Sequence, residues 1–82
     1  MIIHHEQILA GRLLPALYRE ACHKIEREGL MVSPLSNIDL DGLTFEVLSM
    51  PRNGVTERHF TGIVNQPTAK AIKQHYLRRK VE

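Results

Sequence analysis

Two different hydrophobic periods divide the chain, and they constrain its fold more than any other feature. In residues 5–29 apolar side chains recur at every fourth position, the spacing of one face of an α-helix. In residues 43–50 (LTFEVLSM) apolar and polar side chains alternate, as in a half-buried strand. A helical pattern returns after residue 66. Helices at both ends and strands between them predict an α+β fold.

The N-terminal pattern predicts one long helix with a kink. Its apolar face consists of Leu9, Leu13, Leu17, Ala21 and Ile25. Pro15 lies inside the pattern, where it removes an amide donor and clashes with the preceding turn. Because the apolar face stays in phase on both sides of Pro15, we expect a kink near Leu14, and we expect the helix to end at Gly29.

The middle of the chain predicts a small antiparallel sheet. LTFEVLSM, the turn PRNG at residues 51–54 and the return strand VTERHFTGIV form a β-hairpin, with Asn53-Gly54 suited to positive φ. The short segment Ile38–Leu40 is a candidate third strand. The sheet is therefore expected to have two or three strands with this hairpin at its centre.

The last segment predicts a basic C-terminal helix. Pro67 suits its first position, and Ala69, Ile72 and Tyr76 form a narrow apolar stripe. The expected order is α-β-β-(β)-α in one domain over residues 1–82. A chain of this length buries only roughly 60% of its unfolded surface. Since it contains no Trp, two Phe and two Tyr, we expect an aliphatic core.

The cysteine content and the first residues of the chain indicate a cellular compartment. The single cysteine, Cys22, excludes an internal disulfide and fits a reducing compartment. The first residues lack the basic region of a signal peptide, and no run approaches the ~18 apolar residues of a membrane span. We therefore expect a cytoplasmic protein that does not bind or cross a membrane.

No residue pattern points to catalysis, a cofactor or a metal. The sequence HHE at residues 4–6 lacks the second histidine of the metalloprotease motif. Cys22 and His23 are adjacent on a helix, so their side chains diverge by ~100° and suit one metal ion poorly. The five glycines are scattered singly, which excludes a glycine-rich phosphate loop. We expect a protein that is not an enzyme, with no catalytic residue, cofactor or metal.

Positive charge is concentrated at the C-terminal end. Residues 67–82 hold five Lys or Arg and one Glu, whereas residues 1–66 hold six basic and eight acidic side chains. A basic stripe on one helix is able to meet successive phosphates. Basic residues near a helix C-terminus also favour the helix dipole, which offers a purely structural explanation. The candidate nucleic-acid-binding residues are Lys70, Lys73, Arg78, Arg79 and Lys80, together with Arg52 on the hairpin tip.

The apolar face of the first helix suggests a second kind of site. It is wider than one small sheet covers, so a protein partner or a second copy is expected to use it. The candidate interface residues are Leu13, Leu17 and Tyr18. The small sheet is also short enough to need a second copy along an edge.

The element order also resembles that of the double-stranded RNA-binding domain. The resemblance covers Leu14 to Leu77, with FEV at 45–47 in the central strands and TAKAIK at 68–73 opening the last helix. It departs from that family at Gln66 and Pro67, which replace basic residues, and it lacks the family's glycine and histidine loop. The resemblance implies that Lys70 and Lys73 meet phosphates across a groove. Because of these departures, we do not assign the chain to that family.

Taken from its residues, the chain is expected to be a non-enzymatic, adaptor-type binding or regulatory protein that engages a protein partner. A nucleic-acid-binding module that uses the basic C-terminal helix is the alternative.

Overall fold

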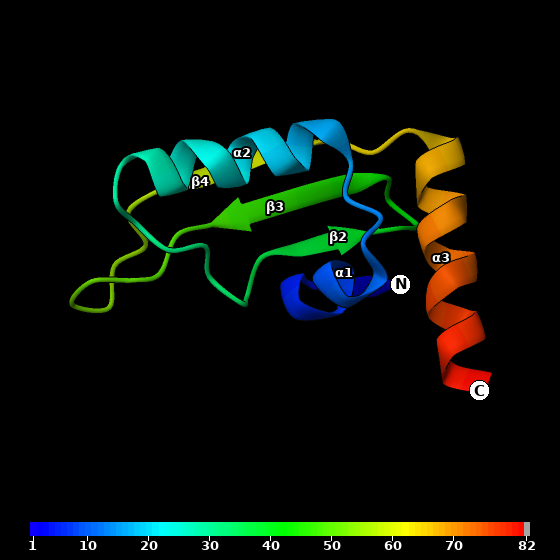
Figure 1. Ribbon diagram of the computed structural model, residues 1–82. Coiled ribbons are helices and arrows are strands. Elements are labelled where there is room, and N and C mark those ends of the chain that lie inside the picture. Colours follow the sequence, from blue (N-terminus) through cyan, green and yellow to red (C-terminus); the bar gives the residue numbers. More distant parts are fainter. Residues whose placement is uncertain (82) are drawn as a thin grey trace.

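The computed structural model describes residues 1–81, with side chains through residue 78. Over these residues the chain forms three helices and a four-stranded antiparallel sheet, so the predicted α+β class is confirmed (Figure 1). The elements are β1 (Ile2–His4), α1 (His5–Gly11), α2 (Ala16–Arg27), β2 (Asn37–Asp39), β3 (Thr44–Leu48), β4 (His59–Ile63) and α3 (Gln66–Val81).

The sheet has the strand order β1-β2-β3-β4, and every neighbouring pair is antiparallel. Helix α2 lies over β3 and β4, while α1 contacts β1 and β2 (Figure 1). Helix α3 crosses one end of the sheet and contacts α1. Among the described residues no helix covers the opposite face, where the side chains of Ile2 and Ile63 are exposed.

The prediction of one long kinked N-terminal helix is wrong. Helix α1 ends because Arg12 adopts a left-handed conformation (φ 58°), and its N–H donates to the carbonyls of Ile8 and Leu9. Pro15 then caps α2 in an extended conformation, with φ −56° and ψ 145°. Proline disfavours a helical conformation at the residue before it, so the segment separates into two helices instead of bending.

The sheet contains one strand more than predicted. The candidate third strand is confirmed as β2, but β1 at the start of the chain was not expected. Three residues are too few for a period to be visible, and β1 exists because the edge of β2 is available to it. Ile3 pairs with Ile38 in this ladder, so both side chains enter the core. With β1 present and the first helix split, the element order departs from that of the double-stranded RNA-binding domain.

The predicted hairpin is confirmed, although its return strand is shorter than expected. β3 and β4 pair from Thr44↔Ile63 to Leu48↔His59. Beyond them the chain forms a long loop whose tip closes through a bridge between Arg52 and Val55. Asn53 and Gly54 have positive φ at this tip, as the turn chemistry predicts.

The core lies between the sheet and the helices, and aromatic rings stand at its centre. Tyr18 of α2 is fully buried and meets Phe45 of β3 edge-on, with ring centroids 5.5 Å apart. Around them pack Ile3, Ile8, Ile25 and other aliphatic side chains. The core is mostly aliphatic, as expected, and the two aromatic rings of Tyr18 and Phe45 are the exception.

Buried serines hold the end of the sheet next to the hairpin loop. The Ser36 hydroxyl accepts a hydrogen bond from the Leu48 N–H (2.8 Å) and donates to the Leu48 carbonyl (3.2 Å). The Ser49 hydroxyl accepts from the Arg58 N–H at 2.8 Å. Side-chain hydroxyls thus supply hydrogen bonds to the backbone where the strands diverge.

Candidate functional site

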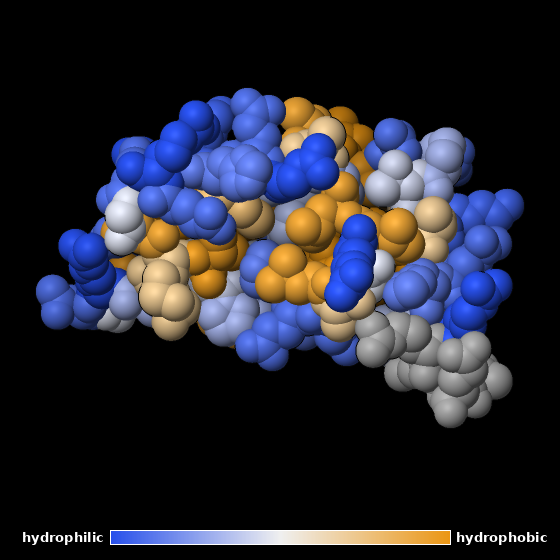
Figure 2. Space-filling model, viewed as in Figure 1, coloured by the Kyte–Doolittle hydropathy of each residue, from blue (hydrophilic) through white to orange (hydrophobic). Residues whose placement is uncertain are grey.

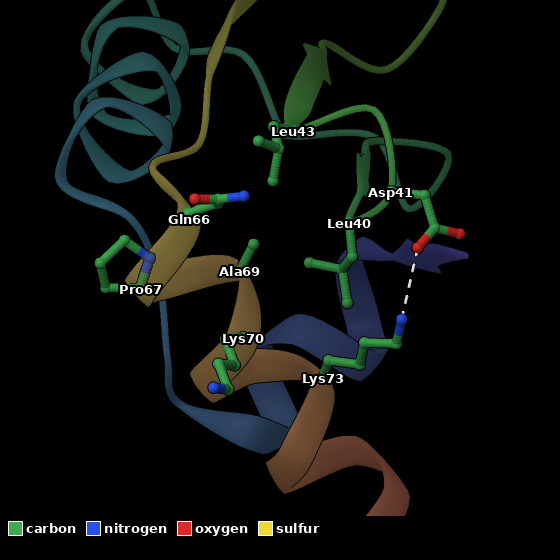
Figure 3. Close-up of a pocket in the computed structure, with 8 residues that line it drawn as sticks. All are labelled: Leu40, Asp41, Leu43, Gln66, Pro67, Ala69, Lys70 and Lys73. Atoms are coloured by element: carbon green, nitrogen blue, oxygen red, sulfur yellow. Dashed lines mark hydrogen bonds and ion pairs between the residues drawn. The ribbon is translucent and has the colours of Figure 1, made fainter.

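An open pocket lies between the start of α3 and the turn that joins β2 to β3 (Figure 3). Its volume is about 690 Å³. Its lining residues are Leu40, Asp41, Leu43, Gln66, Pro67, Ala69, Lys70 and Lys73. Leucine and alanine side chains form the apolar part of its wall, and the two lysines come from successive turns of α3. Two of the predicted nucleic-acid-binding residues therefore share one pocket.

Local turn and cap chemistry builds this pocket. The Asp39 carboxylate accepts hydrogen bonds from the N–H groups of Asp41 and Gly42, both at 3.1 Å. This side-chain turn reverses the chain after β2. On the other side, the Asn65 side chain accepts a hydrogen bond from the Thr68 N–H at 2.9 Å and caps α3. The two walls are thus fixed by residues that are common in turns and caps.

One of the two lysines in the pocket is paired with an acidic side chain. Lys73 Nζ lies 3.3 Å from the Asp41 carboxylate, which also contacts the amino group of Met1 (Figure 3). Hydrogen bonds from that amino group and from Lys73 hold the pKa of Asp41 below its usual value. An anionic ligand at Lys73 would therefore compete with Asp41. Lys70, by contrast, forms no ion pair among the described side chains.

Arg52, another predicted cation, lies far from α3. Arg52 lies on the hairpin tip, at the opposite end of the molecule from α3, and its Nε pairs with Glu57 at 3.2 Å. Arg52 therefore does not extend the basic surface of α3. The Arg78 side chain is exposed on α3. The side chains of Arg79 and Lys80 lie outside the described residues.

Three leucines near the start of the chain are exposed, and we call them the leucine surface: Leu9, Leu13 and Leu17. Their side chains are 48%, 38% and 59% exposed. Figure 2 shows apolar surface in the middle of the helix-covered face, with polar atoms around it. The separation of α1 from α2 explains the exposure, because the two helices do not share one buried face.

Tyr18, the third predicted interface residue, is not on this surface. Its side chain is 0% exposed, and its hydroxyl lies 2.5 Å from His5 Nδ1. The prediction that Tyr18 contacts a partner is thus corrected, because the ring belongs to the core. For Leu13 and Leu17 an interface role stays a prediction.

A shallow groove separates α2 from β4. It is lined by Leu17, Glu20, Ala21, Lys24, Phe45, Phe60, Thr61 and Gly62. Lys24 Nζ lies 5.9 Å from the centroid of the Phe60 ring, within the range of a cation–π contact. The sequence pattern of α2 did not reveal this groove, because it depends on how the helix sits on the sheet.

The residues considered for catalysis or metal binding do not converge. Burial raises the pKa of the Cys22 thiol to about 11, which keeps it protonated and weakly nucleophilic near neutral pH. His59 Nε2 instead lies 2.9 Å from the Glu46 carboxylate on the exposed sheet face. Within residues 1–81 no three His, Cys, Asp or Glu side chains are close enough to hold a metal ion.

The buried contact between His5 and Tyr18 predicts a loss of stability in mild acid. Burial lowers the pKa of His5 below 6.5, and this effect outweighs the nearby charges of Glu6 and Glu26. At pH values between the folded-state pKa and 6.5, the unfolded chain binds a proton that the folded chain does not. The contribution of His5 is therefore complete above about pH 6.5 and is lost as the pH falls below it.

We expect the urea midpoint to fall between pH 7.5 and pH 5.5, and we expect His5→Gln to reduce that fall. His4→Gln is the matched control, because His4 is the exposed neighbour of His5. An equal pH response in all three proteins would contradict this account of His5.

None of the helices that the structure describes combines the length and apolar character needed to cross a membrane. The chain matches no protein-family model, and no curated protein or solved structure matches it significantly.

Proposed function

We propose that the protein is a non-enzymatic, adaptor-type binding module that engages a protein partner through the leucine surface. The observation that carries this proposal is the exposure of Leu9, Leu13 and Leu17 close together in the sequence. Among the other described helical residues, Leu77 is the one large apolar side chain that is also exposed. Complete burial of one leucine contributes about 1.5–3 kcal/mol. Covering the still exposed parts of the three leucines would therefore contribute about 2–4 kcal/mol, and neighbouring contacts would have to supply the rest of the binding free energy.

Partner capture with matched charge variants tests this proposal. Leu9→Glu and Leu13→Glu are each expected to abolish the retention of proteins that the wild type retains from a lysate of its source cells. Val55→Glu is the control, because Val55 is also exposed but lies on the hairpin tip away from α1. Circular dichroism checks that each variant is folded. Equal retention by Leu13→Glu, Leu9→Glu and wild type would contradict the proposed surface.

Nucleic-acid binding through α3 is a second candidate function. It is favoured by one observation, the shared position of Lys70 and Lys73 on the pocket at the start of α3 (Figure 3). Each phosphate that a lysine neutralises adds about 0.9 to the slope of log affinity against log salt for duplex DNA. The Asp41 ion pair with Lys73 reduces what that lysine contributes to such binding.

A salt titration separates this candidate from the first. If α3 binds nucleic acid, the double variant Lys70→Ala/Lys73→Ala weakens binding to mixed duplex DNA and RNA and lowers the salt slope by between about one and two. Arg52→Ala is the control, since Arg52 lies at the other end of the molecule. If the double variant had the same slope of log affinity against log salt as the wild type, α3 would not be part of the nucleic-acid-binding site.

A further inference from the structure

The outer edge of β4 has no partner strand. β4 is the last strand of the sheet, and among the described elements it contacts only β3 and α2 (Figure 1). β1, at the other edge, has three residues, whereas β4 has five. Natural edge strands are usually protected by a proline, a lysine or a bulge. The segment HFTGI contains neither proline nor lysine, and its pairing with β3 runs without a bulge.

The hydrogen bonds around β4 show which of its backbone groups point outward. The Val64 N–H donates to the Leu43 carbonyl at 2.8 Å, and the Arg58 carbonyl accepts from the Ser49 N–H at 3.0 Å. In an antiparallel ladder alternate residues point their backbone groups to the same side. The N–H and C=O groups of His59, Thr61 and Ile63 therefore face away from β3.

We propose that two copies of this chain associate by pairing β4 with β4, antiparallel and centred on Thr61. The two sheets then form one continuous eight-stranded sheet, in which His59, Thr61 and Ile63 exchange backbone hydrogen bonds with the second copy. This proposal does not rest on the leucine surface, although one member of that surface, Leu17, lines the groove beside β4 and would be covered in the dimer.

The side chains of β4 are complementary to those of a second β4 in this register. Phe60 lies directly opposite Gly62 of the second copy, on the helix-covered face. The Phe45 ring of the same chain lies over Gly62, so the Phe60 ring of the second copy would pack beside that ring. On the open face Thr61 meets Thr61 of the second copy, a favourable cross-strand pair. Ile63, which is 74% exposed in one copy, lies beside His59 of the other.

Helix α2 also fits this arrangement. Paired strands lie about 4.8 Å apart, so a helix lying over β3 and β4 comes within about 10 Å of its symmetry mate, close to the distance at which helices pack. The two α2 helices run antiparallel across the two-fold axis. The groove residues Glu20 and Lys24 are one helical turn apart and lie on the side of α2 next to β4. In an antiparallel pair of α2 helices whose two-fold axis passes between these residues, each Glu20 would face Lys24 of the other copy. In that arrangement the facing surface is complementary to itself in charge.

Molar mass in solution, measured by light scattering on a sizing column, tests the proposal. We expect the wild type to have twice its 9.4 kDa chain mass at micromolar concentration. Thr61→Lys places two lysines side by side at the symmetry axis and is expected to weaken association at least about tenfold. Thr44→Lys is the matched control, because Thr44 is an exposed threonine on the same sheet face but in the interior strand β3.

A charge exchange on α2 provides a test that leaves the sheet unchanged. Glu20→Lys and Lys24→Glu each place like charges together and are expected to weaken the dimer, and the double variant is expected to restore it. A monomeric wild type, a dimer insensitive to Thr61→Lys, equal loss with Thr44→Lys, or failure of the double variant to restore association would each overturn the proposal. These variants leave Leu9 and Leu13 intact, so partner capture through the leucine surface is read separately.

Discussion

Replacing Tyr18 with alanine is expected to lower the free energy of unfolding by about 3–5 kcal/mol. The Tyr18 side chain is fully buried, stacks on His5 with ring centroids 5.7 Å apart and meets Phe45 edge-on. A domain of this size is typically stable by about 4–12 kcal/mol, so the variant loses a large part of its stability. Urea denaturation followed by circular dichroism at pH 7.5 measures the change.

Tyr18→Phe is the control, because it keeps the ring and removes only the hydroxyl that contacts His5 Nδ1. We expect it to cost about 0.5–1.5 kcal/mol. If Tyr18→Ala were as stable as the wild type, the buried position of Tyr18 would be contradicted, and Tyr18 would again be a candidate surface residue. The pair of variants thus separates a core residue from an interface residue without knowledge of any partner.

Replacing Gly62 with alanine is expected to destabilise the sheet by about 1–3 kcal/mol through overpacking. A Cβ atom at Gly62 would lie 2.5 Å from both Cε1 and Cζ of the Phe45 ring. That ring is buried against Tyr18 and is not free to move aside. Gly62 does not have the positive φ that requires glycine at Gly54, so the cost comes from space alone.

A double-mutant cycle with Phe45→Leu tests this explanation. The shorter side chain removes the ring atoms in question, so Gly62→Ala is expected to cost less in that background. Urea midpoints of the four proteins give the coupling energy. The same cost of Gly62→Ala in both backgrounds would show that Phe45 is not the cause.

Local patterns predicted the parts of the fold that local chemistry determines. The alternation of Phe45 and Val47 predicted β3, and Asn53-Gly54 predicted the positive φ at the hairpin tip. Pro67 and the stripe of Ala69 and Ile72 predicted α3. In each case the deciding interactions lie within a few residues of one another.

Tertiary contacts determined what the patterns missed. The row of leucines was expected to be a buried face in phase across Pro15, but the break at Arg12 lets each helix turn its own side to the core. The buried row of α2 is instead Tyr18, Ala21, Cys22 and Ile25. One of the predicted interface residues therefore moved into the core, while Leu13 and Leu17 stayed outside. The sequence also did not show that β4 is the edge strand, because hydrophobic periodicity does not determine the order of strands in a sheet.

The place of β1 in the sheet has a consequence for the order of folding. β2, β3 and β4 each pair with the next strand along the chain, and Ile38 needs to reach only as far as Phe45. β1 pairs with β2 across both α1 and α2, so its ladder closes a far longer loop. The contacts between β1 and β2 offset the entropy lost in that closure, and they can form only after β2 is in place. We therefore expect the sheet to grow outward from the hairpin, and the first residues of the chain to be the last to acquire their native contacts.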